Sequence, residues 1–388
     1  MTAGLRTDTR DRRDPRAAAA GDLLRVLHVI ARMPPSGTER QLAGMLRAAH
    51  GRLWQATLCV LHPGDGLTAE LADHGIPVVE LDGRDHLHAE RFAGLRRLVR
   101  SGRFDVVHSS LWGGNAFTRA AAVGPGRPAL VASERRVEDF RGWRRRLIDR
   151  ALRAVTDAYI GNSPAVTGFV ERAHGVPAGT VHLVPNGIDR AVFTPARRRP
   201  RAADAPIRLG GVGRLVQQKG FDVLIDALPA VLEHHDVELR IAGDGELRAD
   251  LERRAAGLPV RFAGLLPTPE AVADFLGDLD VFVMPSRYEG LPNAVLEALA
   301  CGLQVVATDA PGMRAALGGD AELVPAGDPA ALATAITAAL ADRHMASPSA
   351  LPGFDDGAAA HPRVFAAAAG AAAPRAAPHA SISCSEGR

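Results

Sequence analysis

Short apolar segments alternate with longer amphipathic segments along most of the chain. The first apolar run, Arg25-Val-Leu-His-Val-Ile30, is rich in β-branched residues and ends at Met33-Pro-Pro-Ser-Gly37, a pattern typical of a buried strand followed by a turn. Apolar residues then repeat with helical spacing over 39–49. This stretch therefore predicts a strand, a loop and a helix in succession.

The same succession recurs in two series separated by a polar, proline-bounded stretch over 196–206. The first series predicts strands at 25–30, 55–61, 78–81, 106–108, 130–132 and 158–161. The second predicts strands at 207–212, 238–242, 260–263, 281–284 and 304–307, with helices including 221–233 and 293–300. Alternating strands and helices imply an α/β protein with two mainly parallel sheets, each covered on both faces.

These patterns divide the chain into five parts. We expect a disordered leader over 1–21, a first Rossmann-like domain over 22–195, a linker over 196–206, a second Rossmann-like domain over 207–345 and a low-complexity tail over 346–388. Five prolines interrupt the alanine-rich tail, so no long helix is expected there. Two α/β domains of similar size usually bind a ligand in the cleft between them.

Composition and charge narrow the class of protein. The 388 residues are 47% hydrophobic and 23% charged, as in a soluble globular protein of more than one domain. The formal net charge of +2 provides no global field that would recruit nucleic acid. Three dispersed cysteines fit neither a disulfide framework nor a metal site, and no uninterrupted apolar stretch reaches 18 residues. We therefore expect a cytoplasmic protein.

The most informative candidate site is the segment Pro285-Ser-Arg-Tyr-Glu-Gly-Leu-Pro-Asn-Ala-Val-Leu-Glu297. A strand ends before it and a helix starts near Asn293, and the free N–H groups of a helix start bind anions such as phosphate. Two carboxylates flank this position, Glu289 and Glu297, and they suit the hydroxyls of a sugar or ribose better than an anion. The alternative is that Glu289 is a loop charge and Glu297 a residue of a helix face.

A glycine-rich segment and a second turn could meet the same ligand. Gly210-Gly-Val-Gly-Arg-Leu-Val-Gln-Gln-Lys-Gly220 follows a predicted strand and carries two cations that suit a diphosphate, Arg214 and Lys219. Its glycine spacing matches neither the phosphate-binding loop of nucleoside triphosphatases nor the dinucleotide fingerprint, so on its own it reads as a surface loop. Gly37 ends the first strand's loop and would let backbone amides approach a ligand.

Four motifs together resemble a known family. Gly213-Arg-Leu-Val-Gln-Gln-Lys-Gly220, Ile241-Ala-Gly-Asp-Gly-Glu246, the segment from Pro285 to Glu297 and Val184-Pro-Asn-Gly-Ile-Asp189 resemble the retaining nucleotide-sugar glycosyltransferases of family four, over about residues 24–343. The resemblance implies the GT-B fold, in which two Rossmann-like domains face each other across a cleft. It also implies that the first domain binds the acceptor and the second the donor.

The resemblance further implies individual roles. Arg214, Lys219 and Glu289 would be catalytic, with the two cations on the departing phosphate and Glu289 against the transferred sugar. Transfer would retain the anomeric configuration by front-face attack, without a metal or another cofactor. The donor site would consist of Gly37, Gly213, Arg214, Lys219, Glu289, Gly290, Leu291, Asn293 and Glu297.

The sequence departs from the family in two places. Where related enzymes often carry a histidine near the donor sugar, this chain reads Val131-Ala-Ser-Glu-Arg-Arg136, which makes Glu134 and Arg135 cleft candidates without an assigned role. His108 matches a family position at a strand end lining the cleft, and a structural role fits it equally well. Family members also end in a helix that braces the first domain, and the tail lacks the amphipathic pattern of such a helix.

The segment from Arg135 to Arg153 contains eight arginines as well as Phe140 and Trp143. A basic amphipathic helix with aromatic residues can contact an anionic membrane peripherally or an acidic acceptor. Neighbouring acidic residues dilute the charge, so pattern alone favours a solvated helix face.

The sequence therefore predicts a retaining glycosyltransferase that moves a hexose or an N-acetylhexosamine from a nucleoside-diphosphate sugar to a hydroxyl acceptor. Uridine diphosphate is favoured as the carrier on family frequency alone. The acceptor could belong to cell-envelope glycan or to natural-product biosynthesis. Two rival interpretations are a non-catalytic nucleotide-sugar-binding relative and a glycogen- or sucrose-type synthase.

Overall fold

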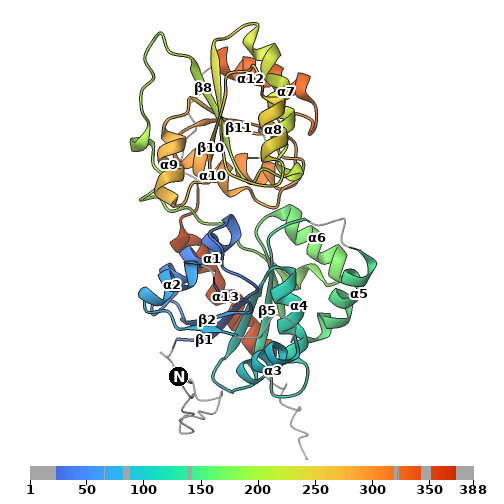
Figure 1. Cartoon of the computed structure of the whole chain (residues 1–388). Helices are drawn as coiled ribbons and strands as arrows, with labels where there is room; N and C mark the ends of the chain where they lie inside the picture. Colours follow the sequence, from blue (N-terminus) through green and yellow to red (C-terminus); the bar gives the residue numbers. More distant parts are fainter. Residues whose placement is uncertain are drawn as a thin grey trace, which may run out of the picture.

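The computed structural model consists of two α/β domains, one above the other (Figure 1). It describes residues 23–64, 66–81, 88–137, 142–318, 321, 323–341 and 351–372. The predicted leader over 1–21 lies outside the described residues. No helix in the described ranges is long and apolar enough to cross a membrane.

The first domain is built on seven parallel strands in the order β3-β2-β1-β4-β5-β6-β7. The strands are β1 (Arg25–Ile30), β2 (Gln55–Val60), β3 (Val78–Glu80), β4 (Val106–Ser110), β5 (Ala129–Glu134), β6 (Ala158–Gly161) and β7 (Val181–Leu183). Its helices are α1 (Gly37–Ala49), α2 (Gly66–Asp73), α3 (His88–Val99), α4 (Leu111–Ala122), α5 (Trp143–Leu152), α6 (Pro164–His174) and α13 (Phe354–Ala372). The six strands predicted for this domain are confirmed, and only β7 was not expected.

The second domain has five parallel strands in the order β10-β9-β8-β11-β12. They are β8 (Ile207–Val212), β9 (Val237–Ala242), β10 (Val260–Gly264), β11 (Val281–Met284) and β12 (Gln304–Ala307). The helices are α7 (Phe221–Leu232), α8 (Arg248–Arg254), α9 (Pro269–Gly277), α10 (Asn293–Ala300), α11 (Met313–Leu317) and α12 (Pro329–Ala341). Near-continuous apolar strands are buried here because helices cover both faces of the sheet.

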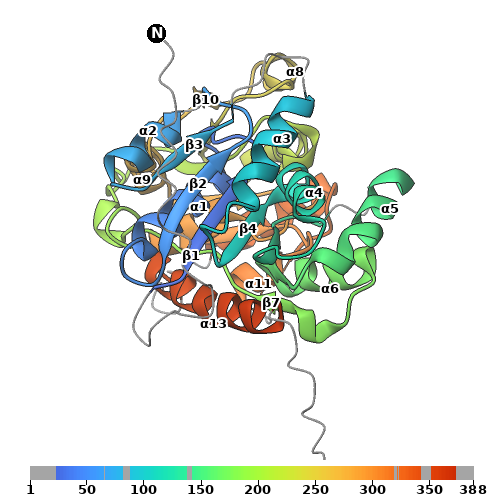
Figure 2. The same ribbon diagram turned by 90° about the horizontal axis from the view of Figure 1, so that it is seen from below.

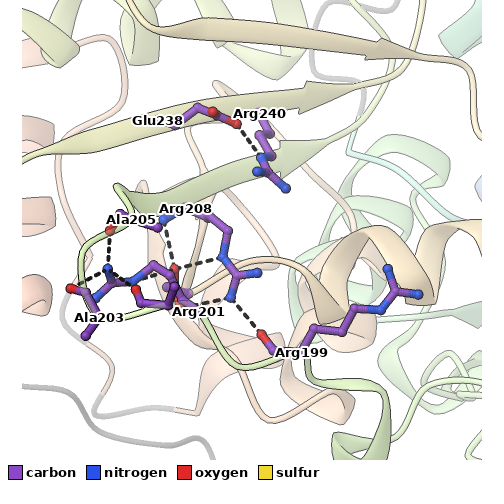
Figure 3. Close-up of polar contacts among 9 residues, drawn as sticks. Arg199, Arg201, Ala203, Ala205, Arg208, Glu238 and Arg240 are labelled. Carbon is purple, nitrogen blue, oxygen red and sulfur yellow. Dashed lines mark hydrogen bonds and ion pairs between the residues drawn. The ribbon is translucent and has the colours of Figure 1, made fainter.

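Arginines fix the segment that joins the two domains. Arg208 donates to both oxygens of Asp280, at 3.1 and 3.2 Å, and to the carbonyl of Arg199, at 2.8 Å. Arg201 donates to nearby backbone carbonyls, among them that of Ala203 at 3.5 Å, as Figure 3 shows together with the neighbouring Glu238–Arg240 pair. The predicted linker has no regular strand or α-helix, but its backbone is tied to the second domain.

The expectation of a tail without a long helix is wrong. α13 is a 19-residue helix that continues through Pro362 and lies across the first domain (Figure 2). A proline inside a helix costs about 3 kcal/mol, because its ring removes one hydrogen bond and crowds the preceding turn. Burial of Ala358, Val364, Phe365 and Ala368 in the core of the first domain offsets that cost. The brace that family members usually have is therefore present.

Three buried histidines meet where α13 packs on the first domain, His28 and His108 beneath the helix and His361 on it. The indole N–H of Trp54 donates to Nε2 of His28 at 3.0 Å, so Nδ1 of His28 carries the proton and donates to Nδ1 of His108, also at 3.0 Å. Nε2 of His108 then donates to the Ser133 hydroxyl at 2.6 Å. This chain of donors requires both imidazoles to be neutral. Desolvation lowers the pKa of His28 to about 3 and that of His361, on α13, to about 4.

We expect acid to destabilise the first domain through these histidines. The unfolded chain binds protons on histidine below about pH 6.5, whereas the folded chain does not, so stability is lost as the pH falls from 6.5 towards 4. Each such histidine contributes about 1.4 kcal/mol per pH unit in that range. Urea unfolding between pH 7 and pH 4 measures the slope.

A matched pair of variants isolates the cluster from other titrating groups. His361→Leu should unfold with a shallower pH dependence, while His234→Leu, at an exposed position in the second domain, should keep the original slope. An identical slope in both variants would show that His361 does not contribute.

Candidate active site

The two domains touch at the start of α1 in the first domain and at the start of α10 in the second domain. Nδ2 of Asn293, the first residue of α10, donates to the carbonyl of Gly37 at 2.9 Å, and its Oδ1 accepts a hydrogen bond from Asn186 at 2.6 Å. The two turns predicted to bind phosphate therefore lie together, on opposite sides of the domain boundary.

Gly290 marks the closest approach of the domains. A Cβ atom at this position would lie 2.1 Å from the carbonyl oxygen of Arg135 in the first domain. The carbonyl of Gly290 accepts a hydrogen bond from the hydroxyl of Ser163 at 2.6 Å. Only glycine fits this contact, which brings the loop before α10 against the first domain.

Lys219 and Glu289 form an ion pair in this loop. Nζ of Lys219 lies 2.6 Å from Oε1 of Glu289, and the Ser286 hydroxyl donates to the same oxygen at 2.8 Å. The two side chains are only 15% and 8% exposed. Partial burial strengthens the pairing and holds the ammonium group in a fixed place at the domain boundary.

The glycine-rich segment positions that lysine. Gly220 has φ +67°, which lets the chain turn from a short 3-10 helix (η4, Gln217–Lys219) into α7. Gln218 ties this segment to the loop before α10, with its amide donating to the carbonyl of Tyr288 at 2.9 Å. Arg214 is exposed and donates to the Gln218 side chain at 3.3 Å. Lys219 and Arg214 therefore both lie in a segment that is hydrogen-bonded to the loop before α10.

Lysine itself is exceptional in this chain. Of its 46 basic residues other than histidine, 45 are arginines and one is lysine, Lys219. An ammonium group is a compact charge with three freely rotating donors, whereas a guanidinium group is a wider planar fork. The stem of Lys219 lies 3.3 Å from where a Cβ on Gly213 would be, so the site leaves little room for a larger group.

A cavity of about 590 Å³ lies between the domains next to Asn293, and Lys219 and Glu289 are not among the residues that line it. Both domains line it, with Gly37 and Arg40 on one side and Asn293 and Glu297 on the other. Its volume is within the range of small-molecule sites. Arg40 donates to the carbonyl of Pro267 at 2.6 Å and so connects α1 to the loop before α9.

Glu297 is the titrating group of the cavity. Burial raises its pKa to about 7, although the positive charges of Arg40 and Lys219 act in the opposite direction. A carboxyl group with such a pKa changes its hydrogen-bonding capacity near neutral pH, since only the ionised form is a pure acceptor.

We expect Glu297→Ala to weaken nucleotide binding, because ribose hydroxyls would lose their acceptor. Above pH 7 the ionised carboxylate accepts well, and below it the group becomes protonated, so affinity should fall as the pH drops from 8 to 6. Calorimetric titration of nucleoside diphosphates at several pH values measures this. Glu297→Gln serves as a control. In this variant the phosphates of the nucleotide still titrate, whereas residue 297 no longer does. An unaltered affinity in Glu297→Ala would reject the ribose role.

Two of the three predicted cleft residues lie away from the cleft. His108 does not line the cleft, because it lies inside β4 and is fully buried among the histidines under α13. Glu134 is also buried within the first domain, where Asn115 donates to it at 3.2 Å. Arg135 does reach the domain boundary, where it donates to Asn186 at 2.8 Å.

Sequence reasoning missed the residues that connect the domains. Arg40 carried one available signal, a cation one turn after the glycine turn of Gly37. Asn186 lies in a motif used for the resemblance, but its contacts with Arg135 and Asn293 join three distant segments and leave no local pattern.

Comparisons with known proteins agree with this arrangement. Residues 35–192 match the model of Glycosyltransferase Family 4, and residues 206–342 match that of Glycosyl transferases group 1. A D-inositol 3-phosphate glycosyltransferase from Geodermatophilus obscurus is 31% identical over 308 residues, which cover 69% of this chain and 68% of that protein. The chain belongs to glycosyltransferase family 4.

A second relative matches over a shorter length, and a solved structure matches over most of the chain. A GDP-mannose-dependent alpha-(1-6)-phosphatidylinositol dimannoside mannosyltransferase from Mycobacterium tuberculosis is 37% identical over 177 residues, or 44% of this chain. The match spans about half of that relative, 46% of its length. Among solved structures, HepE from Anabaena in complex with UDP and glucose has a TM-score of 0.69 at 20% identity, covering 88% of this chain and 95% of HepE. The GT-B fold is confirmed.

Proposed function

We propose that this member of family 4 is a retaining glycosyltransferase that moves a hexose or an N-acetylhexosamine from a nucleoside-diphosphate sugar to a hydroxyl acceptor. The donor binds in the second domain, and the acceptor reaches it from the first. No metal ion takes part in this scheme, because side-chain cations and backbone amides neutralise the diphosphate.

One observation carries the proposal: Lys219 pairs with Glu289 in the loop before α10, and Asn293, at the start of that helix, contacts Gly37 of the other domain. When the bond between sugar and phosphate breaks, negative charge develops on the phosphate oxygen. Fixed cations stabilise that charge most effectively where water is largely excluded. Lys219 and Arg214 supply the cations, and Glu289 accepts hydrogen bonds from the sugar.

Retention follows if the acceptor attacks from the face that the phosphate leaves. The departing phosphate oxygen is then close to the acceptor hydroxyl and can take its proton, so no side chain is needed as a nucleophile. Lys219 and Arg214 hold that oxygen in place during the exchange. Glu289, already bonded to Lys219 and Ser286, orients the sugar instead of attacking it.

Only the relatives support a proposal for the nucleotide base of the donor and for the class of acceptor. The solved structure of HepE contains UDP, and the mannosyltransferase relative is GDP-mannose-dependent. We retain a uridine carrier as the first choice and guanosine as the second. Relatives that act on phosphatidylinositol dimannoside and in lipopolysaccharide core biosynthesis support a cell-envelope glycan over a natural product as the acceptor.

The alternative of a non-catalytic relative has lost its main support. It rests on the absence of a C-terminal brace, and α13 provides one. The lack of the family histidine near the donor sugar remains in its favour. An assay of hydrolysis or transfer of the sugar would distinguish an enzyme from a binding protein. A binding protein would be stabilised by the nucleotide sugar without consuming it.

The sole lysine permits a direct test of donor binding. A panel of uridine, guanosine, adenosine and thymidine diphosphates is added, and the melting temperature is measured, since a ligand at a hundred times its dissociation constant adds about 2.7 kcal/mol. The same samples are treated with an amine-selective reagent, and labelling at Lys219 is located by mass spectrometry. We expect one nucleotide both to raise the melting temperature and to protect Lys219. Stabilisation without protection would place the nucleotide elsewhere, and neither effect would reject the proposed donor site.

A further inference from the structure

Helix α5 presents apolar side chains to solvent. Of its ten residues only Asp149 is buried, while Trp143 is 70% and Leu147 60% exposed. Together with the exposed Ala151 these residues recur every four positions, so they form one stripe along the outer face. Among the described residues six large apolar side chains are exposed, and three of them belong to this one helix.

Arginines flank that stripe. Arg144, Arg145, Arg146 and Arg150 are all exposed, and α5 has no exposed acidic residue. The guanidinium group of Arg145 lies over the ring of Trp112 at 4.5 Å, which attaches the helix to α4. The helix therefore combines an outward apolar stripe with a strongly positive border.

A buried ion pair fixes the orientation of the helix. Asp149 lies 2.5 Å from Arg119 of α4, and both side chains are inaccessible to solvent. Rolling α5 to hide its apolar stripe would pull Asp149 away from Arg119 and break a buried ion pair, which costs several kcal/mol. The apolar stripe thus stays exposed in the isolated protein.

We propose that α5 docks on the surface of an anionic lipid bilayer. Trp143, Leu147 and Ile148 would enter the boundary between headgroups and acyl chains, and the arginines would pair with phosphate groups around them. A nucleic acid would meet the arginines but gain nothing from the leucine and isoleucine. A neutral protein partner would cover the stripe but offer no negative charge to the exposed arginines that border it. An anionic bilayer offers an apolar layer and phosphate groups together, and so matches both features.

The position of α5 relates this surface to the domain boundary. α5 packs against α6, whose first residues, Pro164 and Ala165, line a groove of about 520 Å³ together with Gly312 of the second domain. This groove shares no lining residue with the 590 Å³ cavity, so a bilayer seated on α5 would lie beside a different part of the boundary. The docking itself holds whichever sugar the protein transfers.

Sedimentation with lipid vesicles tests the proposal. The full chain is mixed with vesicles of phosphatidylcholine alone or with 30% phosphatidylglycerol, at low and at physiological salt. We expect binding to the anionic vesicles only, weakened by salt. Trp143→Ser combined with Leu147→Ser, or Arg144→Gln combined with Arg150→Gln, should each weaken binding by about tenfold or more. Leu265→Ser removes an equally exposed apolar side chain from the second domain and should change nothing.

Several outcomes would overturn the proposal. These are equal binding to neutral vesicles, no binding by the unaltered chain, and unchanged binding by the Trp143 and Leu147 double variant. Self-association that the same double variant abolishes would assign α5 to an interface between copies instead. Melting temperature and stabilisation by nucleotide are measured for every variant, because none of the replaced residues contacts the donor site. Failure of docking with intact nucleotide binding leaves the proposed function standing.

Discussion

Replacing Lys219 by alanine should lower the turnover number for sugar transfer by on the order of 10²-fold or more. The ammonium group lies 2.6 Å from Glu289 at the start of α10, where the phosphate would leave. Its charge matters most in the transition state, so kcat should fall more than the Michaelis constant for the donor rises. Steady-state kinetics with the nucleotide sugar identified by the melting screen measures both quantities.

Two further variants separate charge from geometry. Lys219→Arg keeps the positive charge but must fit a wider group into the narrow space beside Gly213, so it should restore only part of the lost turnover. Arg253→Ala removes one positive charge from the exposed surface of α8 and should leave kcat unchanged. If Lys219→Ala keeps the turnover of the unaltered chain, Lys219 has no part in the reaction.

The second large effect concerns stability. Phe365→Ala should destabilise the protein by about 3–5 kcal/mol, because Phe365 is fully buried and its removal leaves a cavity that a rigid sheet cannot fill. Its ring lies 5.3 Å from that of Trp54 and 5.5 Å from that of His108. Thermal and urea unfolding measure the loss, which for a domain of this size corresponds to a lowering of the melting temperature by roughly 10 °C.

The control for this variant lies two residues away. Arg363→Ala changes an exposed position of the same helix and should alter stability by less than about 0.5 kcal/mol. If Phe365→Ala unfolds at the same urea concentration as Arg363→Ala, α13 does not brace the first domain in solution. Kinetics on both variants would then show whether docking of α13 is needed for activity.

Local periodicity was sufficient to predict most of the fold. Buried parallel strands such as β1 and β8 are short apolar runs bounded by glycine or proline, and this pattern survives in any context. The motifs that carry the resemblance are also contiguous, so Lys219, Glu289 and Asn293 could be named as site residues before any coordinates. The meeting of Asn293 with Gly37 could be expected from the doubly wound topology, because strand ends of parallel sheets gather at one edge.

Three features could not be predicted in this way. The helix α13 contains Pro362 and long alanine runs, so its local propensity argues against it, and only burial of Phe365 and its neighbours makes it stable. His108 has a polar side chain at a strand end, but α13 covers it. The pattern of the basic segment from Arg135 to Arg153 predicts a solvated helix but not which of its faces is buried. The buried pair of Asp149 with Arg119 decides which face of α5 points outward.

The sequence by itself therefore determined the strands, most helices, the family and the main donor-site candidates, since each depends on residues close together in the chain. Tertiary structure alone decided the brace, the buried histidines, the contacts of Asn186 and Arg40 across the domain boundary, and the outward face of α5. These depend on free energy of burial shared between segments that are distant in the chain, and no local pattern records which surfaces will meet.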